Sequence, residues 1–398
     1  MTRRLSTERL FTRPFIALGV AELCYFTAAG VAIYALPTYV TGPVGRGEAW
    51  AGVAFGAFAL SALVLRPFAG RLADTIGRLP LLVGGALVAA VSLGLLALAH
   101  DLVSIIALRL LAGVAEAAFF VAGFAALADL APQERLGEAL SYNSLGLYLG
   151  IALGPPLGEV LVGMNGFAFG WAGAAVLTAI AAGLTLFVGE TRKNEGAEAS
   201  DHHLIHRPAL PIAIGFLAAL LAMGGFLAYA TLHASRVGLS SASLALFVYG
   251  GIVVVCRVAF ARVPDKVPPL ALGSAAVGTI GLGLVVVATW LSPAGLIVGA
   301  GVMAVGVSFS TPAFFSAIFA TASPSQRGVA SGTASAAIDL GLGIGPILLG
   351  LFADAFGIPW AFGVGAAIAA AGAVWTLTLF RRRVAARRVG AGRPRSIR

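Results

Sequence analysis

The feature of this sequence that most constrains its fold is a succession of apolar segments, each about 20 residues long, separated by polar turns. A helix of that length spans the roughly 30 Å hydrocarbon layer of a bilayer. Soluble domains carry about 25% charged residues. This chain of 398 residues is 59% hydrophobic and 11% charged, and its mean hydropathy is +0.96. The sequence therefore predicts an all-α integral membrane protein.

Twelve such segments can be placed along the chain, and each predicts one transmembrane helix. Prolines at 37, 155, 312 and 346 fall inside segments and predict kinks. An even number of crossings places both termini on one side of the membrane. The predicted segments are 14–40, 50–69, 80–99, 102–130, 137–162, 168–190, 210–234, 242–260, 270–290, 294–320, 328–353 and 358–380.

The positions of the basic residues predict the orientation of these helices. Most of the 26 Lys and Arg residues fall on the side that holds the N-terminus, whereas Arg46 and Arg236 fall in loops on the other side. Cytoplasmic loops are enriched in Lys and Arg. Both termini are therefore predicted to be cytoplasmic, with the protein in the cell membrane. The basic tail 381–398 is interpreted as a lipid-headgroup anchor rather than a nucleic-acid-binding segment.

Two landmarks recur at an offset of 191 or 192 residues, which indicates two similar halves. Arg66 and Asp74 have counterparts in Arg257 and Asp265. The run from 132 to 155 has a counterpart in the run from 324 to 346, each ending in Gly-Pro. The sequence predicts two six-helix bundles related by a pseudo-two-fold axis. Their predicted bounds are 1–190 and 210–380, joined by a central cytoplasmic loop, 191–209.

Three motifs resemble those of one family of membrane proteins. They are Gly70-x-Leu72-Ala73-Asp74-x-x-Gly77-Arg78, Arg109-x-x-x-Gly113, and Gly150-x-x-x-Gly154-Pro155-x-x-Gly158. Over essentially its whole length the chain is similar to twelve-helix members of the major facilitator superfamily, and the third motif is associated with their proton-driven antiporters. The chain departs from the family pattern at Thr75, where a basic residue often stands, and at Glu159, where the third motif often ends in a second glycine.

The resemblance implies that the first motif is a conformational switch. Gly70 and Gly77 permit close backbone approach. In a state open to the outside, the resemblance places Asp74 at the backbone amides that begin helix eleven, near Gly328, and that position suits a carboxylate. Arg78 would reach Asp129 at the inner end of helix four. The alternative is that the basic residues of this turn only fix the topology.

The other two motifs are also open to two interpretations. Gly150, Gly154 and Gly158 recur every four residues and line one face of a helix, beside the bend at Pro155. This stripe indicates either close helix packing or a specific role in antiport. Arg109 lies inside a segment and is expected to find its partner on a neighbouring helix.

Three acidic residues fall inside apolar segments, where an ionised carboxylate costs several kcal/mol unless a partner or a cavity compensates it. At 1.5 Å per residue, Glu116 lies roughly 21 Å from the outer start of its helix. Asp339 lies roughly 17 Å, and Glu22 roughly 12 Å, from the inner starts of theirs. Each predicts a proton-carrying site or, alternatively, a buried structural hydrogen bond. Glu116 is the first candidate for proton coupling.

The resemblance also implies which residues line the transport pathway. It places Tyr34, Phe119, Tyr229 and Phe314 around the pathway, with Asn143 from helix five. Aromatic residues inside such helices also serve in packing or face lipid, so packing is the competing interpretation.

These observations together predict a monomeric secondary active transporter that exchanges protons for a small drug-like, amphipathic or cationic molecule. A transporter of a sugar, metabolite or siderophore, or a lipid flippase of the same fold, is the alternative. No nucleophile-base pair or Cys/His cluster with metal-ligand spacing is evident, so no enzyme, cofactor or metal site is predicted. The three histidines between 202 and 206 are interpreted as part of a solvated connector.

Overall fold

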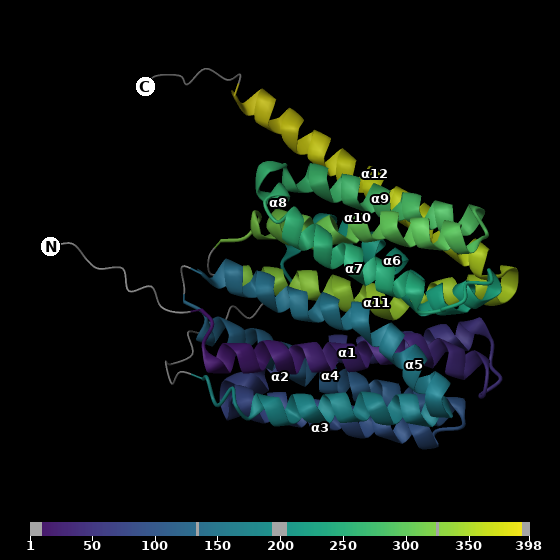
Figure 1. Ribbon diagram of the computed structural model, residues 1–398. Coiled ribbons are helices and arrows are strands. Elements are labelled where there is room, and N and C mark those ends of the chain that lie inside the picture. The colour runs from purple at the N-terminus through teal and green to yellow at the C-terminus, as the bar shows by residue number, and fades with distance from the viewer. Residues whose placement is uncertain (1–9, 133–134, 193–204, 324–325, 392–398) are drawn as a thin grey trace, which may run out of the picture.

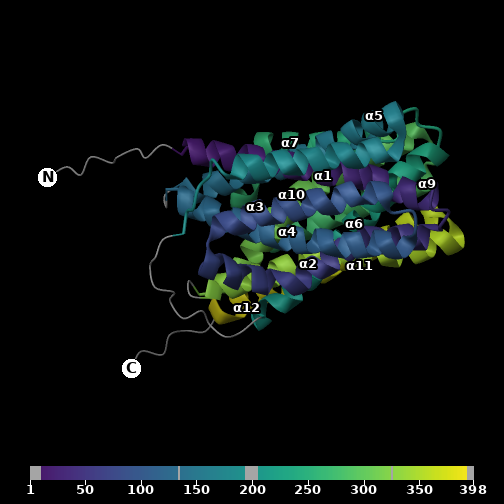
Figure 2. The same ribbon diagram turned by 90° about the horizontal axis from the view of Figure 1, so that it is seen from below.

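The structure is a computed structural model that describes residues 10–132, 135–192, 205–323 and 326–391, without the side chains of 136–138, 140–144, 265, 327–328 and 386–391. Its long helices run side by side along one axis (Figure 1), and the view turned by 90° shows the same alignment (Figure 2). Helix α1 begins and α12 ends at the same end of this bundle. Following the orientation predicted from charge, we call this end the inner end and the opposite one the outer end.

The helices follow the predicted apolar segments. In chain order they are α1 (Arg13–Thr41), α2 (Glu48–Ile76), α3 (Arg78–Leu95), α4 (Leu102–Leu130), α5 (Leu136–Thr185), α6 (Leu210–Arg236), α7 (Leu244–Ala259), α8 (Val263–Lys266), α9 (Pro269–Thr289), α10 (Pro293–Phe319), α11 (Arg327–Phe356) and α12 (Ile358–Ala391), with short 3-10 helices at Leu96–Leu98 and Arg207–Ala209.

Among the described residues, ten helices are long and apolar enough to cross a bilayer. Two of the helices account for the difference from the twelve predicted segments. The apolar part of α5, Leu145–Thr185, has 41 residues, twice the length that one crossing needs. Helix α7 is apolar but has only 16 residues. With α5 taken as two segments and α7 as one, the described helices match the prediction, and the all-α membrane fold is confirmed.

Helix α5 is broken at Asn165 and Gly166, where the chain reverses direction. Gly166 has a φ of +76° and a ψ of −178°, a conformation that L side chains rarely adopt and glycine adopts readily. Beyond the break, Gly170 lies against Val162 and Gly173 against Leu161. The two parts of α5 therefore pack side by side and correspond to the predicted segments 137–162 and 168–190.

The predicted repeat is visible as one contact made twice. A Cβ built on Gly30 of α1 would lie 2.8 Å from the Gly150 carbonyl oxygen of α5. A Cβ built on Gly224 of α6 would lie 3.0 Å from the Gly341 carbonyl oxygen of α11. Small residues allow transmembrane helices to approach this closely. The glycine stripe therefore serves packing in both halves.

Matching residues also begin two matching helices. Asp101 accepts a hydrogen bond from the Ser104 amide at the start of α4, and Ser292, 191 residues later, accepts one from the Gly295 amide at the start of α10. Both are N-cap residues that satisfy otherwise unpaired amides. Hydrogen bonds from the side chain and the amide of Ser104 lower the pKa of Asp101.

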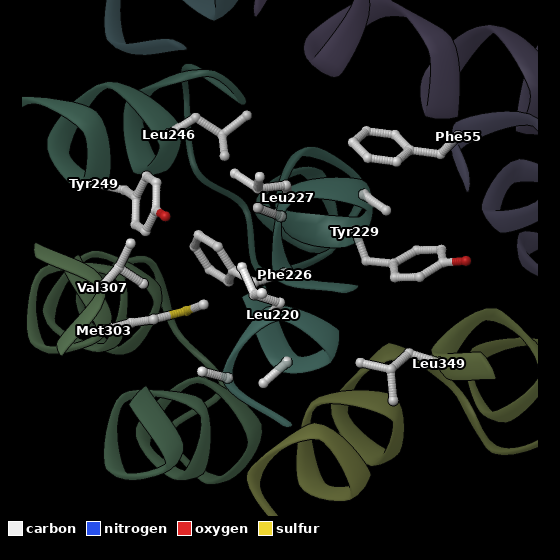
Figure 3. Close-up of a cluster of buried hydrophobic side chains, with 14 of the residues drawn as sticks. Phe55, Leu220, Phe226, Leu227, Tyr229, Leu246, Tyr249, Met303, Val307 and Leu349 are labelled. Carbon is white, nitrogen blue, oxygen red and sulfur yellow. The ribbon is translucent and has the colours of Figure 1, made fainter. Parts of the chain in front are cut away.

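The buried side chains form two cores that divide the molecule unequally. One core contains most of the buried residues of the second half together with residues of α1 to α5, mainly from the outer parts of these helices. Figure 3 shows Phe55 of α2 beside Leu227 and Tyr229 of α6. The other core contains only residues of the first half, mostly from the inner parts of its helices. The halves therefore share apolar packing mainly toward the outer end. The bounds predicted for the two bundles and the central loop stay a prediction.

Candidate functional site

An ion pair joins α2 of the first half to α11 of the second. Arg66 Nε lies 2.5 Å from Asp339 Oδ2, and Arg66 Nη2 lies 2.9 Å from Asp339 Oδ1. The two side chains are 15% and 4% exposed. The Arg66 guanidinium also lies over the Phe120 ring of α4, 4.4 Å from its centroid. Two parallel hydrogen bonds between opposite charges give a strong and directional link.

The sequence analysis placed Arg66 near the end of a segment and missed this pairing. Helix α2 continues to Ile76, so Arg66 lies ten residues, or roughly 15 Å, from the inner end of its helix. Asp339 lies roughly 18 Å from the inner start of α11 at Arg327. The matching depths of an embedded base and an embedded acid are the signal that could have paired them.

Glu116 of α4 lies beside this ion pair. The Tyr25 hydroxyl of α1 lies close enough to the Glu116 carboxyl group to interact with it, and the charged groups of Arg66, Asp339 and Arg109 also lie within electrostatic reach of that carboxyl group. Two predicted acids therefore meet in one group of charges, which four helices contribute. We call this group the central network; it consists of Tyr25, Arg66, Arg109, Glu116 and Asp339.

Arg109 lies at the outer side of the central network and contacts α2. Its Nε is 3.4 Å from the Ala54 carbonyl oxygen, and its guanidinium lies over the Phe58 ring, 4.7 Å from the centroid. One turn further along α4, Gly113 faces Ser61 and the Phe58 carbonyl oxygen without space for a Cβ. The Arg109-x-x-x-Gly113 motif therefore fixes α4 against α2, and the partner of Arg109 is on a neighbouring helix.

Glu22 lies between α1 and α4. Its side chain is buried on α1, and a Cβ built on Gly123 of α4 would lie 2.8 Å from Glu22 Oε1. This glycine thus leaves room for the carboxyl group between α1 and α4. A proton-coupling role for Glu22 stays a prediction.

At the inner end, the turn after α2 is tied to its own half. Arg78 Nε lies 3.2 Å from Asp129 Oδ2, the contact expected from the motif, and Arg78 Nη1 lies 2.9 Å from Asp74 Oδ1. The Asp74 side chain is 68% exposed. Gly70 lies in α2, and a Cβ built on it would lie 4.0 Å from Val121 Cγ1. The contact of Asp74 with α11, expected for a state open to the outside, stays a prediction.

Glu190, which the sequence analysis did not consider, completes this turn. Its two carboxylate oxygens accept hydrogen bonds from the amides of Arg78 at 2.9 Å and Leu79 at 3.2 Å, the first residues of α3. Partial burial would raise the pKa of Glu190, but these and neighbouring backbone hydrogen bonds outweigh it and lower the pKa. Gly77, with a φ of +107°, has no room for a side chain beside this carboxylate.

At the outer end, three helices from both halves meet at Tyr229. Its hydroxyl lies 3.0 Å from the Glu48 carbonyl oxygen of α2 and 2.7 Å from the Pro346 carbonyl oxygen of α11. Figure 3 shows this hydroxyl directed away from the apolar cluster around it. The Glu48 side chain pairs with Arg236 at the end of α6. The outer end is therefore closed by contacts between the halves.

The other residues predicted to line the pathway are packed in the bundle. Phe119 stacks on Tyr25 with ring centroids 4.1 Å apart, and Phe314 stacks on Phe216 at 5.1 Å. Tyr34 lies against Gly158. The Asn143 side chain lies outside the described residues. A substrate-binding role for these residues and for Tyr229 stays a prediction. Phe119 touches the central network through its contact with Tyr25.

The polar connector between the halves holds one described histidine. The His206 amide donates to Thr333 Oγ1 at 2.9 Å, and its ring contacts Thr321. His202 and His203 lie outside the described residues. Within the described residues, no group of three or more His, Cys, Asp or Glu side chains is arranged to hold a metal ion.

Comparison with known proteins agrees with the motifs. A model of the Major Facilitator Superfamily matches residues 18–303 and 272–397. An uncharacterized MFS-type transporter of Burkholderia pseudomallei (strain 1106a) is 28% identical over 387 residues, which cover 93% of this chain and 92% of the relative.

Solved structures share the arrangement of helices. The human organic anion transporter MFSD10 superposes with a TM-score of 0.70 at 15% identity, covering 92% of this chain and 99% of its own. A bacterial homolog of the human lysosomal transporter Spinster, in an inward-facing and occupied conformation, gives a TM-score of 0.75 at 13% identity, covering 92% and 96%. At these identities the likeness concerns the fold alone.

Proposed function

Because the chain belongs to the major facilitator superfamily and is a multi-pass membrane transporter, we propose that it exports a small amphipathic or cationic molecule in exchange for protons, by alternating access. The observation that carries this proposal is the central network, in which Asp339 of one half pairs with Arg66 of the other beside Glu116. We further propose that it works as a monomer in the cell membrane with both termini in the cytoplasm.

The charges of the network supply a physical reason for coupling. Ionised side chains in the hydrocarbon region are expensive and persist where they compensate one another, and here two carboxyl groups lie with two guanidinium groups. A proton bound by Asp339 would neutralise the carboxylate that is in bidentate contact with Arg66. That would remove an ionic link between the halves, so the protonation state and the relative position of the halves depend on each other.

The same network supports a preference for cargo that carries a positive charge. A cationic group that enters between the halves could replace Arg66 as the partner of Glu116 or Asp339 once Arg66 moves away.

A proton moving down 100 mV releases about 2.3 kcal/mol. At 1.4 kcal/mol per tenfold ratio, one proton per neutral cargo supports a gradient of roughly forty-fold. That is sufficient for export of a neutral amphipathic cargo at modest concentration ratios. Exchange of one proton for one monovalent cation moves no net charge, so the pH difference alone would drive it.

The fold itself does not select the cargo. One structural neighbour is described as an organic anion transporter and another as a homolog of a lysosomal transporter, so similar bundles carry different molecules. A sugar, a metabolite, a siderophore and a labelled lipid therefore belong in the same assay as cationic and amphipathic dyes.

The test is transport by the full chain in proteoliposomes under an imposed pH gradient, for the parent, Glu116→Gln and Asp339→Asn. Accumulation of one compound driven by the gradient is expected for the parent and is expected to be lost in both variants. Exchange of labelled for unlabelled compound without a gradient is measured in parallel. It is expected to persist in Glu116→Gln, because exchange needs movement of the halves and no net proton transfer.

Glu48→Gln is the matched control, because it removes a carboxylate that also pairs across the halves but lies at the outer end. Its gradient-driven transport is expected to match the parent. Undiminished gradient-driven transport in both Glu116→Gln and Asp339→Asn would refute the proposed coupling. Transport of the lipid alone would replace export of a soluble molecule with a flippase activity.

A further inference from the structure

Glu159, one of the two positions at which the chain departs from the family motifs, lies near the outer end of the first part of α5. Its Oε1 accepts a hydrogen bond from the Ala242 amide at 2.8 Å. Its Oε2 accepts hydrogen bonds from the hydroxyls of Ser241 and Ser243, both at 2.5 Å, and from the Ser243 amide at 3.2 Å. We call these four residues, Glu159, Ser241, Ala242 and Ser243, the outer clasp.

The outer clasp places a carboxylate at the start of a helix in the other half. Ser243 is the N-cap residue of α7, and the amides that precede the first turn have no partner within the helix. A negative charge at this position is stabilised by the amides and by the helix dipole. Glu159 supplies that charge from α5, so one side chain satisfies the hydrogen-bonding groups of a helix across the boundary between the halves.

A glycine, which often stands at this position in the family, could form none of these bonds. Four hydrogen bonds to a single carboxylate are stronger than bonds between neutral groups. The packing of α5 and α7 below the clasp is apolar and close, with Gly250 of α7 against Ala152 of α5. The charge of Glu159 is therefore an addition to an interface that is already packed.

The clasp stabilises one conformation only. Movement of α5 away from α7 at the outer end would break all four bonds, and opening at the inner end would break none of them. A contact that exists in one of two conformations shifts the equilibrium by its own free energy. We propose that Glu159 is the positioning residue that holds this transporter closed toward the outside. The proposal rests on the alternating access included in the proposed function, and it does not depend on proton coupling.

The test measures distances between spin labels on the full chain in lipid nanodiscs, after replacement of Cys24 and Cys256. Labels at Leu98 and Leu291, which are exposed at the outer end on opposite halves, report outer opening. Labels at Leu72 and Phe260, which are exposed at the inner end, report inner closing. In Glu159→Gln the ratio of outer-open to outer-closed molecules is expected to rise roughly tenfold or more, the size expected when hydrogen bonds to a charged group are lost.

The two label pairs must change together. A longer outer distance accompanied by a shorter inner distance supports the clasp, because the halves then rock as bodies. An unchanged outer distribution in Glu159→Gln overturns it. A longer outer distance with an unchanged inner one also overturns it, because only the local contact has then loosened.

Two further variants make the assignment specific. Glu48→Gln removes the ion pair with Arg236, whose side chain is 51% exposed while that of Glu48 is 16% exposed. A pair that is open to solvent on one side contributes little, so the distance distribution of this variant is expected to remain that of the parent. An equal shift in Glu48→Gln would show that any charge lost at the outer end has the same effect, and would overturn the assignment to Glu159.

The second variant carries both Ser241→Ala and Ser243→Ala, and therefore weakens the clasp from the other side. Combined with Glu159→Gln, it is expected to shift the equilibrium by less than the sum of the two separate shifts, because both changes act on the bonds between Glu159 and the hydroxyls of Ser241 and Ser243. Fully additive shifts would contradict the proposal. The distances between the spin labels are measured without substrate and without a pH gradient. A shift of these distances in Glu159→Gln would therefore support the clasp even if transport is not driven by protons. Unchanged distances would refute the clasp even if transport is driven by protons.

Discussion

The two interfaces between the halves carry matching arginines with different partners. Arg66 of α2 pairs with the carboxylate of Asp339 on α11. Arg257 of α7, which is 191 residues further along, donates from Nη2 to the Tyr148 hydroxyl of α5 at 2.9 Å and lies 4.2 Å from the centroid of the Tyr148 ring. Tyr148 is the counterpart of Asp339 at the same offset. The repeat therefore duplicates the position of the contact and changes its chemistry.

This difference teaches where proton coupling can reside. A carboxyl group exchanges protons near physiological pH when its surroundings favour it, whereas a tyrosine hydroxyl ordinarily ionises near pH 10. The Arg257 side chain also has a buried Nε that finds no hydrogen-bond partner among the described residues. In the proposed mechanism, proton coupling therefore resides at the interface between α2 and α11, where the partner of the arginine is a carboxylate. The interface between α5 and α7 gives Arg257 a hydroxyl and an aromatic ring in place of a carboxylate.

The largest effect that tests this comparison is expected from Asp339→Ala. Removal of one partner of a buried ion pair leaves the other charge uncompensated, which costs about 3–5 kcal/mol. The free energy of unfolding, or the thermal midpoint in detergent, is expected to fall accordingly. Arg66→Leu combined with Asp339→Leu is expected to recover most of the loss. A stability of Asp339→Ala equal to that of the parent would show that Arg66 does not depend on this carboxylate.

A smaller and equal effect is expected from Gly154→Ala and Gly345→Ala, which test the part of the repeat that is shared. A Cβ on Gly154 would lie 2.5 Å from the Thr27 carbonyl oxygen, and one on Gly345 would lie 3.0 Å from the Leu221 Cα. Overpacking of this kind costs about 1–3 kcal/mol. Thermal unfolding of both variants measures the losses. A large loss in only one half would show that the packing is less symmetric than the contacts indicate.

The sequence was sufficient for the features that repeat or that depend on hydropathy. The apolar segments predicted the helices because only lengths near 20 residues cross the hydrocarbon layer, and Gly150 and Gly154 predicted a closely packed face. The contact between Arg78 and Asp129 followed from the motif. Each of these features is local in the chain or duplicated within it.

The features that the sequence did not yield are contacts between distant segments. Arg66 and Asp339 are 273 residues apart, and their pairing depends on how two bundles meet, which no periodicity encodes. Glu159 was visible only as a departure from a motif, and its partners follow from the loop before α7. Glu190 was overlooked because an acidic residue in a loop has no pattern until the start of α3 is placed beside it.

A modest effect is expected from Tyr148→Phe at the second interface. This change removes the hydroxyl that accepts from Arg257 and keeps the ring beneath the guanidinium. The loss of one hydrogen bond is worth about 1 kcal/mol, well below the loss expected for Asp339→Ala. The stability is measured by the same thermal unfolding, and gradient-driven transport is expected to persist. Abolished coupling in Tyr148→Phe would mean that both interfaces carry protons.

The smallest effect concerns the starts of α3 and α9, the long helices that follow α2 and α7. The groups at these two helix starts differ between the halves. Helix α3 begins beside the carboxylate of Glu190, whereas α9 begins with Pro269, which has no amide hydrogen to donate. The position that corresponds to Glu190, 191 residues later, is Arg381. A pH-dependent helix start is therefore expected in the first half only.

Glu190→Gln tests that expectation through its dependence on pH. Hydrogen bonds to the backbone lower the pKa of Glu190 from its ordinary value of 4.5, so its stabilising contribution is complete above pH 4.5 and is lost as the pH falls through the lowered pKa. At pH 7 the variant is expected to be about 0.5 kcal/mol less stable, a small value because the side chain is exposed and screened by solvent. The difference in thermal midpoint between parent and variant should shrink below pH 4.5. A difference that stays constant down to pH 3 would show that the amides of α3 do not depend on the charge of Glu190.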